Sequence, residues 1–212
     1  TNPNQTCVVS NGSGNVAGAN VSNVSVVCTT NTYTIGGTLS GLAAGRSVTL
    51  RNNGGNDLVL SANGAFSFTT PITDGNAYAV TVFAQPTNPN QTCVVSNGSG
   101  NVAGANVSNV AVVCTTNTYT IGGTLSGLAA GASVSLQNNG GDTLALSANG
   151  AFSFATALAD GSSYSVTVFA QPAGSFQQVC QLSSGSGTVT GANVTTVAVT
   201  CVSENLFSNG FE

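Results

Sequence analysis

The chain has 212 residues, of which only 4% are charged, and its formal net charge is −4. Soluble globular proteins usually carry about 25% charged residues, so its solubility must come from neutral polar side chains. The only cations are Arg46 and Arg51, too few for a basic patch, which excludes nucleic acid and an anionic membrane surface as expected partners. Hydrophobic residues reach 41%, which is too many for a disordered chain.

An internal repeat organises the chain. Residues 1–86 align without a gap with residues 87–172, and a diverged, partial third copy ends at Cys201. The chain opens on TNPNQTCVVSNGSGNVAGANV, which returns letter for letter from Thr87. Because the second occurrence follows five strand-like segments, we expect residues 1–30 to be the closing hairpin of a preceding, incomplete repeat.

Seven short strands are expected in each full repeat. Their sequences alternate apolar and polar residues, are rich in Val, Thr, Phe and Tyr, and are separated by turn dipeptides such as Asn53-Gly54, Asn63-Gly64 and Asp74-Gly75. In chain order the first full repeat reads YTIGGTL, SVTLRNN, DLVLSAN, GAFSFTT, YAVTVFAQ, QTCVVSNGS and VSNVAVVC. The alternation predicts a core face made by Val48, Leu50, Leu58, Leu60, Phe66, Phe68, Tyr78, Val80 and Val82.

This pattern predicts an all-β chain of tandem antiparallel, immunoglobulin-like β-sandwiches. The expected parts are the hairpin at 1–30, two repeats at 31–116 and 117–201, and a C-terminal tail at 202–212, with residues 115–118 as a short linker. The five strands that should precede the first hairpin lie either upstream in a longer chain or on a neighbouring subunit. Of these two, a longer repeat protein is the preferred interpretation.

Six cysteines fall into three equally spaced pairs, Cys7 with Cys28, Cys93 with Cys114, and Cys180 with Cys201. Such pairs predict three local disulfides and an oxidising, extracellular destination. Each bridge should clasp the last two strands of its repeat and stabilise it by about 3 kcal/mol. No apolar run approaches the roughly 20 residues of a membrane-spanning helix.

The run YTIGGTLSGLAAGRSVTLRNNGG, continued by LSANGAFSFTTPITDGNAYAVTV and the closing cysteine pair, resembles the tandem immunoglobulin-like repeats of bacterial cell-surface and secreted proteins. The resemblance implies a stalk, an adhesin or an extracellular fibre. The ending ENLFSNGFE resembles the ends of exported proteobacterial proteins, and an ordinary solvated tail is the alternative.

Little in the sequence points to catalysis, and we expect no catalytic residue, metal or cofactor. The chain has no histidine, the usual base for nucleophilic catalysis. Asp57 and Asp74 are the only carboxylate pair of the first repeat that could serve a glycosidase, and aspartate before glycine, as at Asp74 and Asp160, first predicts a turn. The loops NNGGND and NNGGDT also predict turns, since calcium sites gather several carboxylates.

Aromatic side chains are the remaining candidates for binding. Tyr33, Tyr78, Phe83 and their equivalents Tyr119, Tyr164 and Phe169 are expected in the core rather than as sugar-stacking platforms, while Phe176, Phe207 and Phe211 are not assigned. The predicted function is therefore a non-enzymatic extracellular structural protein, whose uncharged edges favour association with other copies. The alternative is a carbohydrate- or surface-binding module that uses loops at one end of the sandwich.

Overall fold

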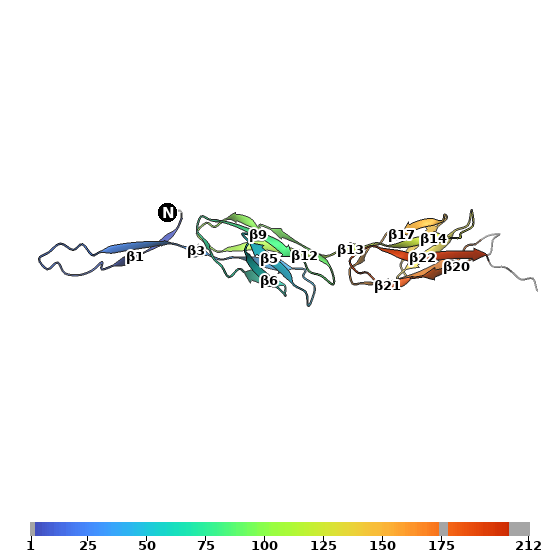
Figure 1. Cartoon of the computed structure of the whole chain (residues 1–212), viewed down its shortest axis with the longest axis horizontal. Coiled ribbons are helices and arrows are strands. Elements are labelled where there is room, and N and C mark those ends of the chain that lie inside the picture. Colours follow the sequence, from blue (N-terminus) through green and yellow to red (C-terminus); the bar gives the residue numbers. More distant parts are fainter. Residues whose placement is uncertain (1–2, 174–177, 204–212) are drawn as a thin grey trace, which may run out of the picture. The chain divides into compact units, whose positions relative to one another are not determined.

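The computed structural model describes residues 3–173 and 178–203, and all regular structure in them is β-strand (Figure 1). The chain forms two compact units, one made of Thr1–Pro86 with Gln91–Thr115 and the other of Thr87–Asn90 with Thr116–Glu212. Within the described ranges, no helix is present that could cross a membrane. The ending from Glu204 onward and Phe176 lie outside the described residues.

The first unit contains a separate hairpin and a sandwich of two four-stranded sheets. The hairpin pairs β1 (Gln5–Ser10) with β2 (Ser25–Thr30), and a short pair joins β3 (Thr32–Tyr33) to β8 (Ile72–Thr73). One sheet has the order β10-β12-β4-β7, with β4 (Ile35–Ser40), β7 (Gly64–Ser67), β10 (Gln91–Ser96) and β12 (Val107–Thr116). The other has the order β11-β9-β5-β6, with β5 (Val48–Asn52), β6 (Asn56–Leu60), β9 (Ala77–Ala84) and β11 (Ser99–Asn101).

The second unit repeats this sandwich strand for strand. Its short pair joins β13 (Thr118–Tyr119) to β18 (Leu158–Ala159). One sheet has the order β17-β14-β22-β20, with β14 (Ile121–Ser126), β17 (Gly150–Ser153), β20 (Gln178–Ser183) and β22 (Val194–Ser203). The other has the order β16-β15-β19-β21, with β15 (Val134–Asn138), β16 (Asp142–Leu146), β19 (Ser163–Ala170) and β21 (Ser186–Thr188).

Each sandwich encloses an apolar core where the alternation predicted it. Val48, Leu50 and Phe68 are almost fully buried, and Phe68 packs edge-on against Phe66 with ring centroids 6.1 Å apart. Leu58, Leu60 and Val82 pack against this cluster and are partly buried. The second core repeats the arrangement around Phe154 and Leu136. The prediction of an all-β sandwich is thus confirmed.

One pairing in each sandwich departs from the predicted antiparallel arrangement. β12 pairs with β4 in parallel, and β22 pairs with β14 in parallel, each with a register shift near its start. These are the first and last long strands of each sandwich, and they become neighbours only when the fold closes. Alternation in the sequence assigns the faces of a strand but carries no information about the direction of a distant neighbour.

Several short connections also differ from expectation. The prediction of a four-residue linker at 115–118 is wrong. β12 continues to Thr116 and β13 begins at Thr118, which leaves Asn117 alone between them. Threonine has a high strand propensity, so both flanks extend the neighbouring ladders. The strands β3, β8 and β11 were not expected, since two or three residues are too few to show a period.

Three disulfides join strands within the hairpins: Cys7–Cys28, Cys93–Cys114 and Cys180–Cys201. The bonded residues stand directly opposite each other in the ladders β1–β2 and β20–β22. In each sandwich a short strand, β11 or β21, lies between the two bridged strands in sequence and pairs with the opposite sheet. The hairpin segment therefore contributes to both sheets.

Glycine is required where the first and last strands of a sandwich meet. A Cβ atom on Gly37 would overlap the carbonyl oxygen of Val110, and one on Gly123 would overlap that of Val197. In both cases the obstructing atom is backbone, which cannot move without breaking the parallel ladder. The Ile-Gly-Gly sequence of β4 and β14 thus sets how closely the closing strand approaches.

We expect Gly123→Ala to lower the free energy of unfolding of the second sandwich by roughly 1 to 3 kcal/mol, the range of overpacked cores. Gly141→Ala is the matched control, because no atom lies within 4 Å of a Cβ built there. Chemical denaturation followed by tyrosine fluorescence measures both. Equal losses in the two variants would show that close strand approach is not the reason for the glycine.

Candidate functional site: the disulfide hairpins and the carboxylates that hold them

The chain contains the same hairpin in two environments. Residues 1–28 match residues 87–114 at every position except one, where Ser25 stands in place of Ala111. In the later copy the hairpin is part of a sandwich. In the first copy β1 and β2 form a two-stranded sheet of their own, drawn in blue in Figure 1.

One face of the first hairpin is exposed where its later copy is buried. Val16 is 79% exposed, while its equivalent Val102 is 1% exposed. The same contrast holds for Val26 and Val112, at 60% and 0%. Cys7, Cys28, Val24 and Gln5 belong to the same face, and their equivalents Cys93, Cys114, Val110 and Gln91 are buried.

The opposite face of the hairpin faces solvent in both copies. Val27 and its equivalent Val113 are 61% and 50% exposed, and Val8 and Val94 are exposed to the same extent as each other. The difference between the copies is therefore confined to one face. We call the face formed by Gln5, Cys7, Val16, Val24, Val26 and Cys28 the unpartnered face.

A buried glutamine shows what this face contacts when it is covered. In the first sandwich the Gln91 side chain donates to the carbonyl of Gly41 and accepts from the amide of Ala43, both at 2.9 Å. Gln178 makes the same two bonds in the second sandwich. Gln5 instead donates to the Thr30 hydroxyl at 3.2 Å. The contact that Gln91 makes with the loop after β4 therefore has no counterpart in the first hairpin.

A buried carboxylate accepts hydrogen bonds at the base of the first hairpin. Asp74 accepts hydrogen bonds from the amides of Asn4, at 2.6 Å, and Gly104, at 2.7 Å. Asn4 precedes β1, and Gly104 lies at the tip of the hairpin that closes the sandwich. A backbone ladder reinforces the contact, because the Asn31 amide donates to Asn4 and the Asp74 amide donates to Asn31.

The second unit repeats this arrangement with Asp160. Its carboxylate is buried and accepts from the amides of Asn90 and Gly191. The Asn117 amide donates to the Asn90 carbonyl, and the Asp160 amide donates to the Asn117 carbonyl. Each sandwich thus presents an acceptor to the segment that leads into a disulfide hairpin.

The electrostatics of Asp74 follow from its partners. Hydrogen bonds from the amides of Asn4 and Gly104 hold the pKa of the Asp74 carboxyl below its ordinary value of 3.8. Since the ionised form accepts these bonds, their contribution to stability is fully present above that ordinary value. It is lost as the pH falls through the lower pKa of the folded state.

Asp57 and Asp74, the carboxylate pair considered for glycosidase chemistry, bind other groups in the structure. Asp57 forms a two-pronged ion pair with Arg51, with oxygen to nitrogen distances of 2.6 and 2.8 Å, and this contact lowers the pKa of Asp57. Asp74 is buried and accepts from backbone amides instead. The two carboxylates are thus occupied by separate partners.

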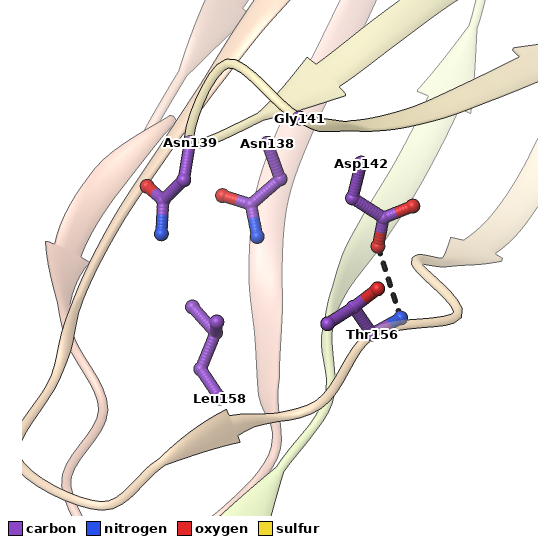
Figure 2. Close-up of a pocket in the computed structure, with 6 residues that line it drawn as sticks. All are labelled: Asn138, Asn139, Gly141, Asp142, Thr156 and Leu158. Carbon is purple, nitrogen blue, oxygen red and sulfur yellow. Dashed lines mark hydrogen bonds between the residues drawn. The ribbon is translucent and has the colours of Figure 1, made fainter.

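The loop NNGGDT lines a pocket of about 410 Å³ in the second unit (Figure 2). Asn138, Asn139 and Asp142 line one side, and Thr156 and Leu158 line the other. The only carboxylate there, Asp142, accepts from the Thr156 amide at 2.9 Å. Among the described residues, no group of three acidic, cysteine or histidine side chains gathers at one place.

The aromatic predictions divide. Tyr78 and Tyr164 are buried, and Tyr33 and Tyr119 pack against the cores. The prediction is wrong for Phe83 and Phe169, which are 55% and 62% exposed, because they lie out of phase with the inward residues of their strands. The Arg51 guanidinium carbon lies 3.4 Å from the centroid of the Phe83 ring, whereas the second repeat has Gln137 in place of Arg51.

Sequence reasoning missed the roles of Asp74, Asp160 and the buried glutamines. One signal was available: aspartate occupies this position in both copies, while Arg46, Arg51 and Asp57 are replaced by Ala132, Gln137 and Thr143. An acid kept while the other charges change points to a structural requirement. A turn alone would accept asparagine or serine as well.

Comparisons with known proteins return only remote structural matches. No family model matches the chain, and no curated protein matches it. The Bacillus anthracis TIE protein matches 85% of this chain with 37% of its own, at 13% identity and a TM-score of 0.48. The pilus adhesin SpaC from Lactobacillus rhamnosus GG matches 84% of this chain with 32% of its own, at 14% identity and a TM-score of 0.32.

A third solved structure, the major pilin protein T-13 of Streptococcus pyogenes, matches 82% of this chain with 97% of its own, at 12% identity and a TM-score of 0.23. Two of these three structures are named as pilus proteins. The chain spans about a third of the length of the first two structures.

We expect Asp74→Asn to speed hydrogen exchange at the amides of Asn4 and Gly104, because a neutral amide is a weaker acceptor for two donors. In the unsubstituted chain the same protection should be lost on acidification below pH 3.8, the ordinary pKa of Asp74. Amide exchange read by NMR measures both. Asp57→Asn is the control and should leave the two amides protected; protection that persists in Asp74→Asn would contradict the assignment.

Proposed function

We propose that the chain is a non-enzymatic structural segment of a bacterial surface stalk, adhesin or extracellular fibre, in which each sandwich resists tension along the polypeptide. The observation that carries this proposal is the parallel pairing of β4 with β12 and of β14 with β22. Three disulfides, which persist in oxidising compartments, support a surface or secreted location.

The direction of the paired strands decides how a sandwich responds to force. Tension on the backbone enters β4 at Ile35 and leaves β12 at Thr116. Because the two strands run the same way, these points lie at opposite ends of their shared ladder. A pull therefore slides one strand along the other and loads the hydrogen bonds together, instead of separating them one at a time.

The disulfide limits what happens after a sandwich yields. Cys93 and Cys114 are separated by 21 positions, so the residues between them cannot lengthen while the bond is intact. The bond also ties β12 to β10, which keeps the force-bearing strand in a hairpin. A repeat that unravels therefore keeps residues 93–114 in a covalently closed loop.

We expect handles at positions 33 and 116, which shear the β4–β12 ladder, to require a higher unfolding force than handles at positions 40 and 116, which peel it from one end. Single-molecule force spectroscopy on the full chain measures both. Equal forces in the two directions would overturn the mechanical function.

The same instrument tests the disulfide. Reducing agent should lengthen the extension released by each sandwich by roughly 70 Å, given about 3.4 Å for each extended residue and a separation of 21 positions. The double variant Cys93→Ser with Cys114→Ser is the matched control, and it should lengthen only the first sandwich without reductant. Unchanged extensions would show that the bridges do not limit unravelling.

Carbohydrate binding is a second candidate, favoured by the exposed Phe169 ring on β19. On the neighbouring strand β15, Gln137 stands opposite Thr167, two residues from Phe169, and its side-chain amide donates to the Thr143 hydroxyl at 3.3 Å. An exposed ring on the same sheet as an amide and a hydroxyl is a combination that can stack on a sugar and hydrogen-bond to it. The ring lies on a strand, not in the end loops that the sequence suggested.

A glycan array tests this candidate. If Phe169 binds sugar, Phe169→Ala should abolish a reproducible signal, and Arg51→Ala should raise it by uncovering Phe83. No reproducible signal in the unsubstituted chain and in Arg51→Ala would exclude sugar binding by these rings.

A further inference from the structure

We propose that the β1–β2 hairpin is a docking element, and that its partner is a β-segment of the kind formed by residues 33–86, with counterparts of the five longer strands β4, β5, β6, β7 and β9, presented without a closing hairpin of its own. The inference rests on the proposed structural function and names the partner through which repeats connect. It follows from three properties of the unpartnered face: its sequence, its free strand edge and its glutamine.

The first property is that the same sequence is already seen in its covered state. Apart from Ser25, residues 1–28 are identical to residues 87–114, which pack against residues 33–86. Val24 and Val26 are exposed, whereas Val110 and Val112 are fully buried. The unpartnered face can therefore make every side-chain contact that the covered copy makes.

The second property is a free edge on β2. Its equivalent β12 lies between β10 and β4, whereas β2 is paired only with β1 in the part of the chain that the structure describes. An edge strand presents unpaired amides and carbonyls that can accept another strand. In the covered copy Val110 stands beside Gly37 of β4, so the incoming strand must have glycine opposite Val24.

The third property is the glutamine side chain, which needs hydrogen-bond partners when it is buried. Gln91 bridges the carbonyl of Gly41 and the amide of Ala43 in the loop after β4, and Gln5 occupies the same place in the first hairpin. A partner that lacks this loop would leave a buried amide without hydrogen bonds, which costs free energy. The glutamine thus selects for a segment with the Leu-Ser-Gly-Leu-Ala turn of this repeat.

Two hairpins packing face to face are a weaker alternative. A second hairpin would cover the valines but offers neither the glycine-containing parallel strand nor the loop that Gln5 requires. The interface of the covered copy contains no charged side chain among the residues named here, so docking should be insensitive to salt.

The test mixes the full chain with a separate polypeptide of residues 31–86. We expect a one-to-one complex by calorimetry and new amide protection at Val24 and Val26 by NMR. Val26→Glu should weaken binding at least tenfold. Val27→Glu is the matched control, because Val26 and Val27 are equally exposed in the hairpin but only Val26 belongs to the unpartnered face.

A second arrangement covers the case in which the separate segment does not stay in solution. Residues 31–86 are fused directly before Thr1, which reproduces the order found before Thr87. A third cooperative unfolding unit should appear, should be lost in Val26→Glu and should persist in Val27→Glu.

The outcomes are distinct. No protection at Val24 and Val26 in either arrangement overturns the inference, as does a chain that dimerises alone and becomes monomeric in Val26→Glu. Neither result bears on the force measurements, which concern the sandwiches at 33–116 and 119–203. Conversely, docking can succeed even if those sandwiches prove mechanically weak.

Discussion

The parallel ladder between the first and last long strands of each sandwich is the interaction on which the rest of the structure depends. It closes the sheet β10-β12-β4-β7 and buries the apolar side of the hairpin. It also determines that a pull on the two ends of a sandwich would shear this ladder and not peel it. Glycine inside a strand normally weakens it, and Gly37 is tolerated because the carbonyl of Val110 occupies the space of its side chain.

Much of the fold could be predicted because the alternation of inward and outward residues in a strand is visible in a short stretch of sequence. The alternation at Val48, Leu50, Phe66 and Phe68 is visible within a few residues, and it gave the faces correctly. The parallel neighbour of β12 could not be predicted in this way, since β4 lies some seventy residues earlier and local pattern does not encode direction. The exposure of Phe83 could have been predicted from its own strand, because Tyr78, Val80 and Val82 face the core and Phe83 follows Val82 directly.

The candidate site was less predictable than the fold, because its parts come from distant places in the chain. Asp74 meets Asn4, 70 positions away, and Gly104, 30 positions away. Such a cluster leaves no motif of fixed spacing. The two copies nevertheless hold the information: in a chain with so few charges, a buried aspartate kept at the same place in both must be offset by dedicated donors.

The two copies of one hairpin show that its burial is decided by tertiary partners and not by its own sequence. Both copies are clasped by a disulfide across the same pair of strands. β1 and β2 are therefore formed without a partner, whereas residues 13–15, equivalent to β11, and residues 21–24, equivalent to the first part of β12, are not strands. The paired part of the hairpin has little conformational entropy left to lose on docking, which favours association. The disulfide that stabilises the hairpin within a complete sandwich thus also holds the exposed hairpin in the paired form that docking requires.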